Sequence, residues 1–193
     1  MKPSVTRRQF TTVAVKTGVA SLAVPAIVRA GESPNERIVV GVMGLSRGRA
    51  LAITFHQQPN TVVRYVADPD RRRVEEVAKE LTKLGAQTQP VADFRKILDD
   101  PEVDALVIAA PDHWHAPAGI MACAAGKHVY VEKPCSHNPA EGEMLVAAAR
   151  KYNRVVQMGN QRRSWPAVRE GIARLKEGVI GQVVVSRAWY TAR

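Results

Sequence analysis

The sequence of 193 residues has little cysteine and few aromatic side chains, with two Cys and 5% Phe, Trp and Tyr. Two cysteines cannot form the disulfide framework of a small secreted scaffold, although Cys123 and Cys135 could pair in an oxidising compartment. Cys123 lies in an alanine-rich helical pattern, which favours buried packing over a disulfide. No zinc-finger spacing occurs, so no metal site is predicted among six side chains that fall within 25 residues: His113, His115, Cys123, His128, Cys135 and His137.

Repeats and low-complexity segments are also missing after residue 30. The hydrophobic content of 46% is typical of a globular protein and excludes a chain that is disordered throughout. The length allows one good-sized domain, or one domain and the start of another.

Negative charge is missing from residues 1–30, which carry five positive side chains and no acid. Residues 31–153 have a net charge of −1 and residues 154–193 a net charge of +6, so the overall +10 lies at the two ends of the chain. A nucleic-acid-binding protein is expected to carry a basic patch on its folded body. The nearly neutral middle therefore argues against a nucleic-acid partner.

The first thirty residues have the layout of a signal peptide. A basic start is followed by a mostly small, apolar stretch at 13–28, and residues 28–30 resemble a cleavage site. This stretch is too short and too weakly apolar for a stable membrane anchor. Residues 6–10, with Arg7 and Arg8, resemble the twin-arginine signal, although Thr11 and Thr12 stand where Leu and Lys are usual. We expect export of the folded protein to the periplasm by this route; a disordered basic tail is the alternative.

The rest of the chain alternates short apolar runs with helical patterns. Strands are predicted at 37–43, 61–67, 87–91, 104–109, 128–131 and 155–158, and helices at 70–84, 94–98, 115–125 and from 138 onward. Such alternation implies right-handed crossovers and an α/β fold with a doubly wound parallel sheet. Ligands of such sheets bind beyond the carboxyl ends of the strands, so the candidate site is sought there.

The loop after the first strand is rich in glycine. Its residues Gly44, Ser46, Arg47 and Gly48 approach the dinucleotide fingerprint G-x-G-x-x-G, which places a pyrophosphate at a helix N-terminus. The loop is one residue short of that pattern, and Ser46 replaces the second glycine. It therefore predicts either a phosphate site or a tight strand-to-helix turn without a ligand.

An acidic residue, Asp68, follows the second strand, 24 residues beyond Gly44. A carboxylate at about this position binds the ribose hydroxyls of NAD and repels the 2′-phosphate of NADP. Arg71, Arg72 and Arg73 follow, and could instead accommodate NADP or form a solvated helix face. NAD is the predicted cofactor, and NADP remains possible.

A lysine, Lys133, follows the fifth strand between Glu132 and Pro134. A lysine in a cleft can carry a proton if loss of water lowers its pKa, and a neighbouring glutamate can orient it. The alternative is a surface lysine in a turn.

Three segments together resemble the glucose–fructose oxidoreductase, inositol dehydrogenase and rhizopine-catabolism family (Gfo/Idh/MocA). They are residues 107–117, residues 126–134 with Glu-Lys-Pro, and residues 157–163. The resemblance covers nearly all of residues 37–190. It implies a Rossmann domain that binds NAD(P), here assigned to residues 31–163, and hydride transfer to or from a sugar or polyol.

The resemblance also implies roles for individual residues. Pro111, Asp112 and His115 would contact the cofactor after the fourth strand. Lys133, with Glu132, would lie near the nicotinamide and the reacting hydroxyl, and Gln161 would lie near the nicotinamide. The second domain of the family supplies most substrate contacts.

Residues 164–193 contain only the beginning of such a domain. A capped helix is predicted at 164–177, followed by a strand at 182–190. We interpret the chain as the cofactor half of a longer enzyme, or as a small protein whose last strand pairs with another chain, for instance in a homo-oligomer. The alternative functions are an NAD-dependent glycoside hydrolase of the same fold and a nucleotide-binding module without catalysis.

Overall fold

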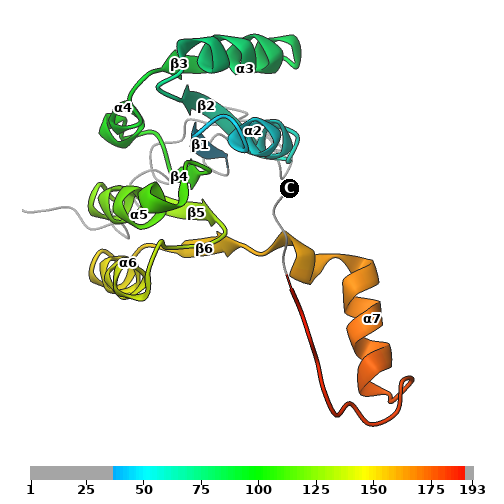
Figure 1. Ribbon diagram of the computed structural model, residues 1–193. Helices are drawn as coiled ribbons and strands as arrows, with labels where there is room; N and C mark the ends of the chain where they lie inside the picture. The colour runs from blue at the N-terminus through cyan, green and yellow to red at the C-terminus, as the bar shows by residue number, and fades with distance from the viewer. Residues whose placement is uncertain (1–36, 190–193) are drawn as a thin grey trace, which may run out of the picture.

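The computed structural model describes residues 37–189, so the expected signal at 1–30 lies outside the described residues. Residues 37–189 form six strands, six α-helices and two 3-10 helices (Figure 1). Their order is β1 Ile38–Met43, α2 Gly48–His56, β2 Thr61–Ala67, α3 Arg71–Lys83, β3 Gln89–Val91, α4 Arg95–Asp99, β4 Ala105–Ile108, η2 Asp112–Trp114, α5 His115–Ala124, β5 His128–Glu132, α6 Pro139–Lys151, β6 Val156–Gly159, η3 Gln161–Ser164 and α7 Pro166–Lys176.

All six strands are parallel and form one sheet in the order β3-β2-β1-β4-β5-β6. The order reverses between β1 and β4, which is the switch point of a doubly wound sheet. The predicted fold class is therefore confirmed, and the carboxyl ends of the strands lie along one edge.

Helices cover both faces of the sheet, α2 and α3 on one and α4, α5 and α6 on the other (Figure 1). The side chains of β4 divide between the two faces as a strand's period of two requires. Leu106 and Ile108 pack with Cys123 of α5, whereas Val107 packs on the opposite face with Ala52 of α2. This two-sided burial explains why the strands are continuously apolar in sequence.

The helices predicted at 70–84 and from 138 onward both form, and each has a side-chain cap at its start. The side chain of Asp70 accepts a hydrogen bond from the Arg72 N–H at the start of α3. At the start of α6, Asn138 accepts from the Glu141 N–H and Pro139 takes the first turn. Leu84, the last residue of the predicted helix at 70–84, lies beyond the end of α3 and is exposed.

The C-terminal part of the described chain differs from the prediction. Ser164 ends η3 and does not cap α7, which begins at Pro166 after Trp165. The strand predicted at 182–190 is not formed over 182–189, and residue 190 lies outside the described part. A strand needs a neighbour for its backbone hydrogen bonds, and within residues 37–189 none pairs with this segment.

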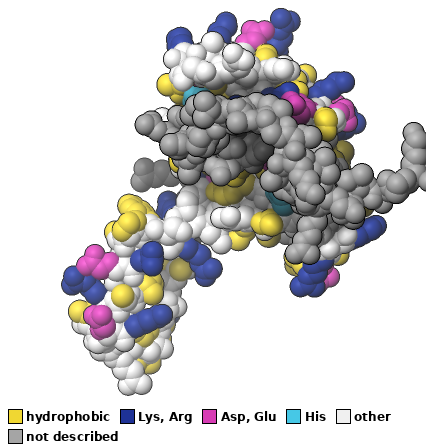
Figure 2. Space-filling view, turned by 180° about the vertical axis from the view of Figure 1, so that it is seen from behind, with side chains coloured by type: hydrophobic (Ala, Val, Ile, Leu, Met, Phe, Trp, Pro, Cys, Tyr) yellow, Lys and Arg dark blue, Asp and Glu magenta, His cyan; other side chains and the backbone are white. Residues whose placement is uncertain are grey.

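α7 projects away from the sheet, and every one of its residues is exposed (Figures 1 and 2).

No helix within residues 37–189 combines the length and the apolar character needed to cross a bilayer. Cys123 and Cys135 are free thiols, and burial raises the pKa of the Cys123 thiol.

Candidate cofactor site

The loop between β1 and α2 depends on two glycines. Gly44 has a φ of +84°, and a Cβ atom there would lie 2.5 Å from the backbone nitrogen of Ala110 after β4. Gly48, the first residue of α2, is buried, and its Cβ would lie 3.2 Å from Val42 and 3.3 Å from Ala109. Gly44 therefore provides the tight turn and Gly48 the close packing of helix on strand. The shortened loop keeps both functions.

The shortened loop also closes its own backbone. The Gly48 N–H donates to the carbonyl oxygen of Gly44 over 3.0 Å. Ser46 and Arg47 are exposed ahead of α2. Within the described chain, the backbone N–H groups of these two residues bond to no acceptor. Such groups at a helix N-terminus suit a phosphate, and the loop therefore fits the pyrophosphate of a dinucleotide.

Asp68, after β2, is held by the backbone on both sides and is only 6% exposed. One carboxylate oxygen accepts from the Leu45 N–H over 2.7 Å, and the other accepts from the Asp70 N–H over 2.9 Å. These bonds fix the carboxylate beside the glycine loop. Each oxygen keeps a lone pair for a ligand hydroxyl, so the position fits a ribose.

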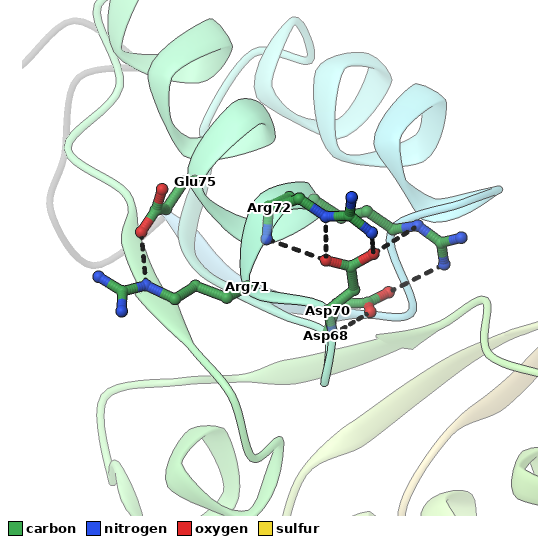
Figure 3. Close-up of polar contacts among 6 residues, drawn as sticks. Asp68, Asp70, Arg71, Arg72 and Glu75 are labelled. Atoms are coloured by element: carbon green, nitrogen blue, oxygen red, sulfur yellow. Dashed lines mark hydrogen bonds and ion pairs between the residues drawn. The ribbon is translucent and has the colours of Figure 1, made fainter.

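The three arginines that follow do not act as a group (Figure 3). Arg71 pairs with Glu75 and Arg72 with Asp70, and both arginine side chains are almost fully exposed on α3. Only Arg73 turns toward the site, with a guanidinium nitrogen 4.0 Å from Asp68. The interpretation as a solvated helix face therefore applies to Arg71 and Arg72, which form ion pairs with Glu75 and Asp70 at the start of α3.

A cleft of about 590 Å³ opens beside Asp68, between the exits of β1, β2, β3 and β4. Gly44, Asp68 and Pro111 of the predicted set line it. It is also lined by residues that sequence reasoning did not assign to the site, among them Phe94, Arg95, Trp114 and Met121.

The far wall of the cleft is aromatic and charged. The rings of Phe94 and Trp114 meet edge to face with centroids 6.0 Å apart. Arg95 donates to Asp93 and holds the pKa of that carboxyl below its ordinary value. The strand predicted at 87–91 could have located this wall. Residues 92–95 follow its carboxyl end, where ligands of parallel sheets bind.

A second group of predicted residues meets around Glu132, which is 4% exposed. One of its carboxylate oxygens accepts from the Gln161 side chain over 2.7 Å and lies 3.5 Å from the Arg47 guanidinium. The other accepts from the backbone N–H of Lys133 over 3.2 Å. The exits of β1, β5 and β6 are thus joined at one carboxylate.

Glu132 also acts on Tyr130, two residues earlier on the same face of β5. Burial, and then the negative charge of Glu132, raise the pKa of this phenol, while Arg47 lowers it.

The remaining predicted residues take different positions. The Lys133 side chain is exposed, so the structure supplies no burial of this amine. Asp112 is exposed at the start of η2 and does not line the cleft. His115 is buried, and both of its ring nitrogens lie against backbone carbonyl oxygens.

Together these features define a dinucleotide-binding Rossmann domain: a glycine loop at a helix N-terminus, an acid after β2, and a cleft at the switch point. The profile of the Gfo/Idh/MocA oxidoreductase family, described as an NAD-binding Rossmann fold, matches residues 37–160. The chain belongs to this family, and its cofactor is of the NAD(P) type.

The chain is similar to curated relatives that are named as dehydrogenases. It is 30% identical to levoglucosan dehydrogenase of Pseudarthrobacter phenanthrenivorans, over 80% of this chain and 41% of that protein. It is 34% identical to inositol 2-dehydrogenase of Rubrobacter xylanophilus, over 81% of this chain and 44% of that protein. The chain thus spans about two fifths of the length of these relatives.

A solved structure shows the same fold. A 3-ketoreductase from Actinomadura kijaniata, crystallised with NADP, superposes with a TM-score of 0.68 at 28% identity. The match covers 76% of this chain and 46% of that one.

The two glycine positions 44 and 85 provide a test of the loop. Both have positive φ, but a Cβ at Gly85 meets nothing within 4 Å. Gly85→Ala should cost about 1–2 kcal/mol of unfolding free energy from its backbone alone. Gly44→Ala should cost about 1–3 kcal/mol more, because the Ala110 backbone must move. Urea denaturation measures both, and NADH titration should show weaker binding for Gly44→Ala only. Equal costs at the two positions would mean that the contact with Ala110 does not constrain the loop.

Proposed function

We propose that this chain is the cofactor-binding half of an oxidoreductase that transfers a hydride between NAD and a secondary alcohol carbon of a sugar or polyol. The observation that carries the proposal is the order of groups along one sheet edge. Asp68 follows β2, the glycine loop follows β1, and Glu132 ends β5 with Lys133 directly after it. This order supports ribose, phosphate and reacting-group positions in the sequence in which a dinucleotide presents them.

In this proposal, the chain's own residues bind and orient. Asp68 accepts hydrogen bonds from ribose hydroxyls, and the N-terminus of α2 holds the pyrophosphate. Arg47 and Gln161 fix Glu132, which in turn fixes the backbone of Lys133. When bound, the nicotinamide supplies the hydride acceptor or donor. Lys133 takes the hydroxyl proton as the alcohol becomes a carbonyl, and returns it in the reverse direction.

NAD is favoured over NADP by the burial of Asp68. A 2′-phosphate would face this carboxylate at short range, and Arg73, the cation beside it, already lies near Asp68 and Asp70. The names of the relatives support the substrate class, since levoglucosan and inositol are a sugar derivative and a polyol.

The cofactor preference is tested with Asp68→Asn, which keeps the shape and one acceptor oxygen of the side chain. We expect NADH affinity to fall and NADPH affinity to rise, so that their ratio changes by about tenfold or more, or roughly 1.4 kcal/mol. Binding is measured by fluorescence titration of the reduced cofactors.

The matched control is Asp70→Asn, two residues away. Asparagine also caps helices, so α3 is retained while one nearby negative charge is removed. If both variants change the ratio equally, general charge rather than Asp68 sets the preference. Absence of NADH binding by the unaltered chain would refute the proposed function itself.

The proton-carrying role is tested with Lys133→Met in an active form of the protein, using a panel of sugars and polyols. Turnover should fall by about 10²–10⁴-fold, as for other general acid–base groups, while NADH affinity changes by no more than a few-fold. Lys151→Met, on α6, is the control and should leave both unchanged. Parallel loss of binding and turnover would contradict the role of Lys133. Release of free sugar without net NADH would instead identify an NAD-dependent glycoside hydrolase, and binding without any turnover a nucleotide-binding module.

We also propose that residues 1–30 direct export through the twin-arginine route, on the strength of the sequence pattern around Arg7 and Arg8. A folded reporter fused to residues 1–36 should reach the periplasm. Replacing both arginines with lysine should retain it in the cytoplasm; continued export would show that another signal operates.

A further inference from the structure

His115 is the first residue of α5 and the only histidine within residues 37–189 that is fully enclosed, at 1% exposure. Its Nε2 lies 2.8 Å from the carbonyl oxygen of Ala110. Its Nδ1 contacts the carbonyl oxygen of Pro134. A neutral imidazole carries one ring N–H, so His115 donates to one of these carbonyl oxygens and its other nitrogen lies against the second. Both ring nitrogens thus face the main chain, and neither is left for a cofactor.

The two carbonyl groups come from the exits of neighbouring strands. Ala110 follows β4, and its backbone is also the wall against which Gly44 turns. Pro134 follows β5 and is bonded directly to Lys133. Through one imidazole, the segment that backs the glycine loop is thus connected to the segment that carries the lysine.

Besides the contacts of His115, this segment has a hydrogen bond to Glu132 and the packing of Cys135 against the core. Glu132 accepts from the Lys133 N–H over 3.2 Å, and the Lys133 side chain is exposed without an ion pair in the described chain. Residues 133–136 contain no helix or strand. The β4–β5 pairing ends at Ile108 and Val131, and beyond it the contacts of His115 link Pro134 to the β4 exit.

From this geometry we propose that His115 is a positioning residue: it ties the Lys133–Pro134 segment to the β4 exit and so fixes where the lysine stands beside the nicotinamide. This differs from the cofactor contact that the family resemblance implies for His115. The inference rests on the proposed function for the role of Lys133, but the tie itself does not require a cofactor.

Two substitutions separate the tie from simple core packing. His115→Leu fills a similar volume and donates to neither carbonyl. His115→Gln keeps an amide NH₂ group with two donors and should restore the tie. Leu145→Ala, which loosens the packing of α6 on α5 at Gly119, is the control for destabilisation without loss of these bonds.

The first measurement is amide hydrogen exchange in the chain without cofactor. In His115→Leu, exchange of the Lys133 amide, which donates to Glu132, should accelerate by about tenfold or more, and by more than exchange in α5. His115→Gln should stay within about threefold of the unaltered chain, and Leu145→Ala should accelerate α5 and α6 rather than the Lys133 amide. Unchanged exchange of the Lys133 amide in His115→Leu would overturn the proposal.

The second measurement compares NADH with ADP-ribose, which lacks the nicotinamide ring. Each His115 variant should bind ADP-ribose within about threefold of the unaltered chain. The fluorescence of bound NADH, which reports the surroundings of its nicotinamide ring, should change in His115→Leu and recover in His115→Gln. A tenfold loss of ADP-ribose affinity in both variants, with exchange unchanged, would show that His115 contacts the cofactor.

If His115→Leu does not fold, the unaltered chain still decides the question. In ¹⁵N-labelled protein, a ring N–H bonded to a buried carbonyl should exchange slowly with water, and its signal should move little when ADP-ribose is added. A fast-exchanging ring proton, or a large shift on addition, would overturn the proposal. If the unaltered chain binds no NADH, the proposed function fails while the exchange data still establish or refute the tie.

Discussion

The site depends on one constraint, the close contact of two backbone segments. These segments are the turn at Gly44 after β1 and the chain at Ala110 after β4. A single added carbon at residue 44 would overlap the Ala110 backbone, so the two segments meet without side chains between them. That contact places the N-terminus of α2 at the switch point of the sheet. It also makes the β4 exit a fixed reference, from which His115 extends the same rigidity to the β5 exit.

Two buried carboxylates flank this contact, and each has its charge compensated in its own way. Asp68 is satisfied by backbone N–H groups, whereas Glu132 is satisfied by Gln161, the Lys133 N–H and the Arg47 guanidinium. A buried carboxylate without such partners would be strongly destabilising. Between them, the N-terminus of α2 offers partial positive charge. The edge of the sheet therefore alternates negative, positive and negative, from Asp68 through the N-terminus of α2 to Glu132.

Much of the fold was predictable because its signals are local. The apolar runs of β1 and β4 and the helical patterns of α3 and α6 act within a few residues of themselves, and each element forms where it is predicted. Strand pairing is not local, which is why the segment at 182–189 alternates in sequence like a strand without forming one.

The residues of the site also divide into those with local sequence signals and those placed by tertiary contacts. Gly44, Asp68 and Glu132 follow strands that are easy to recognise, and the rule that ligands bind at strand exits locates them. Phe94 and Trp114 line the cleft only because β3 pairs with β2 and because η2 folds back toward α4. The contacts of His115 with the carbonyl oxygens of Ala110 and Pro134 likewise depend on tertiary placement, since residues 110 and 134 are distant in sequence.

The exposure of α7 has a consequence for how that helix folds. Its 11 residues are fewer than an isolated helix needs to be stable in water, and its local support consists of Pro166 in the first turn and one Arg174–Glu170 pair. Such features contribute only tenths of a kcal/mol each. Val168, Ile172 and Leu175 lie on one side of the helix and face solvent. The helix–coil equilibrium of α7 therefore depends on burial of that side. The folding of α7 is coupled to contact with another apolar surface rather than to the folding of the sheet.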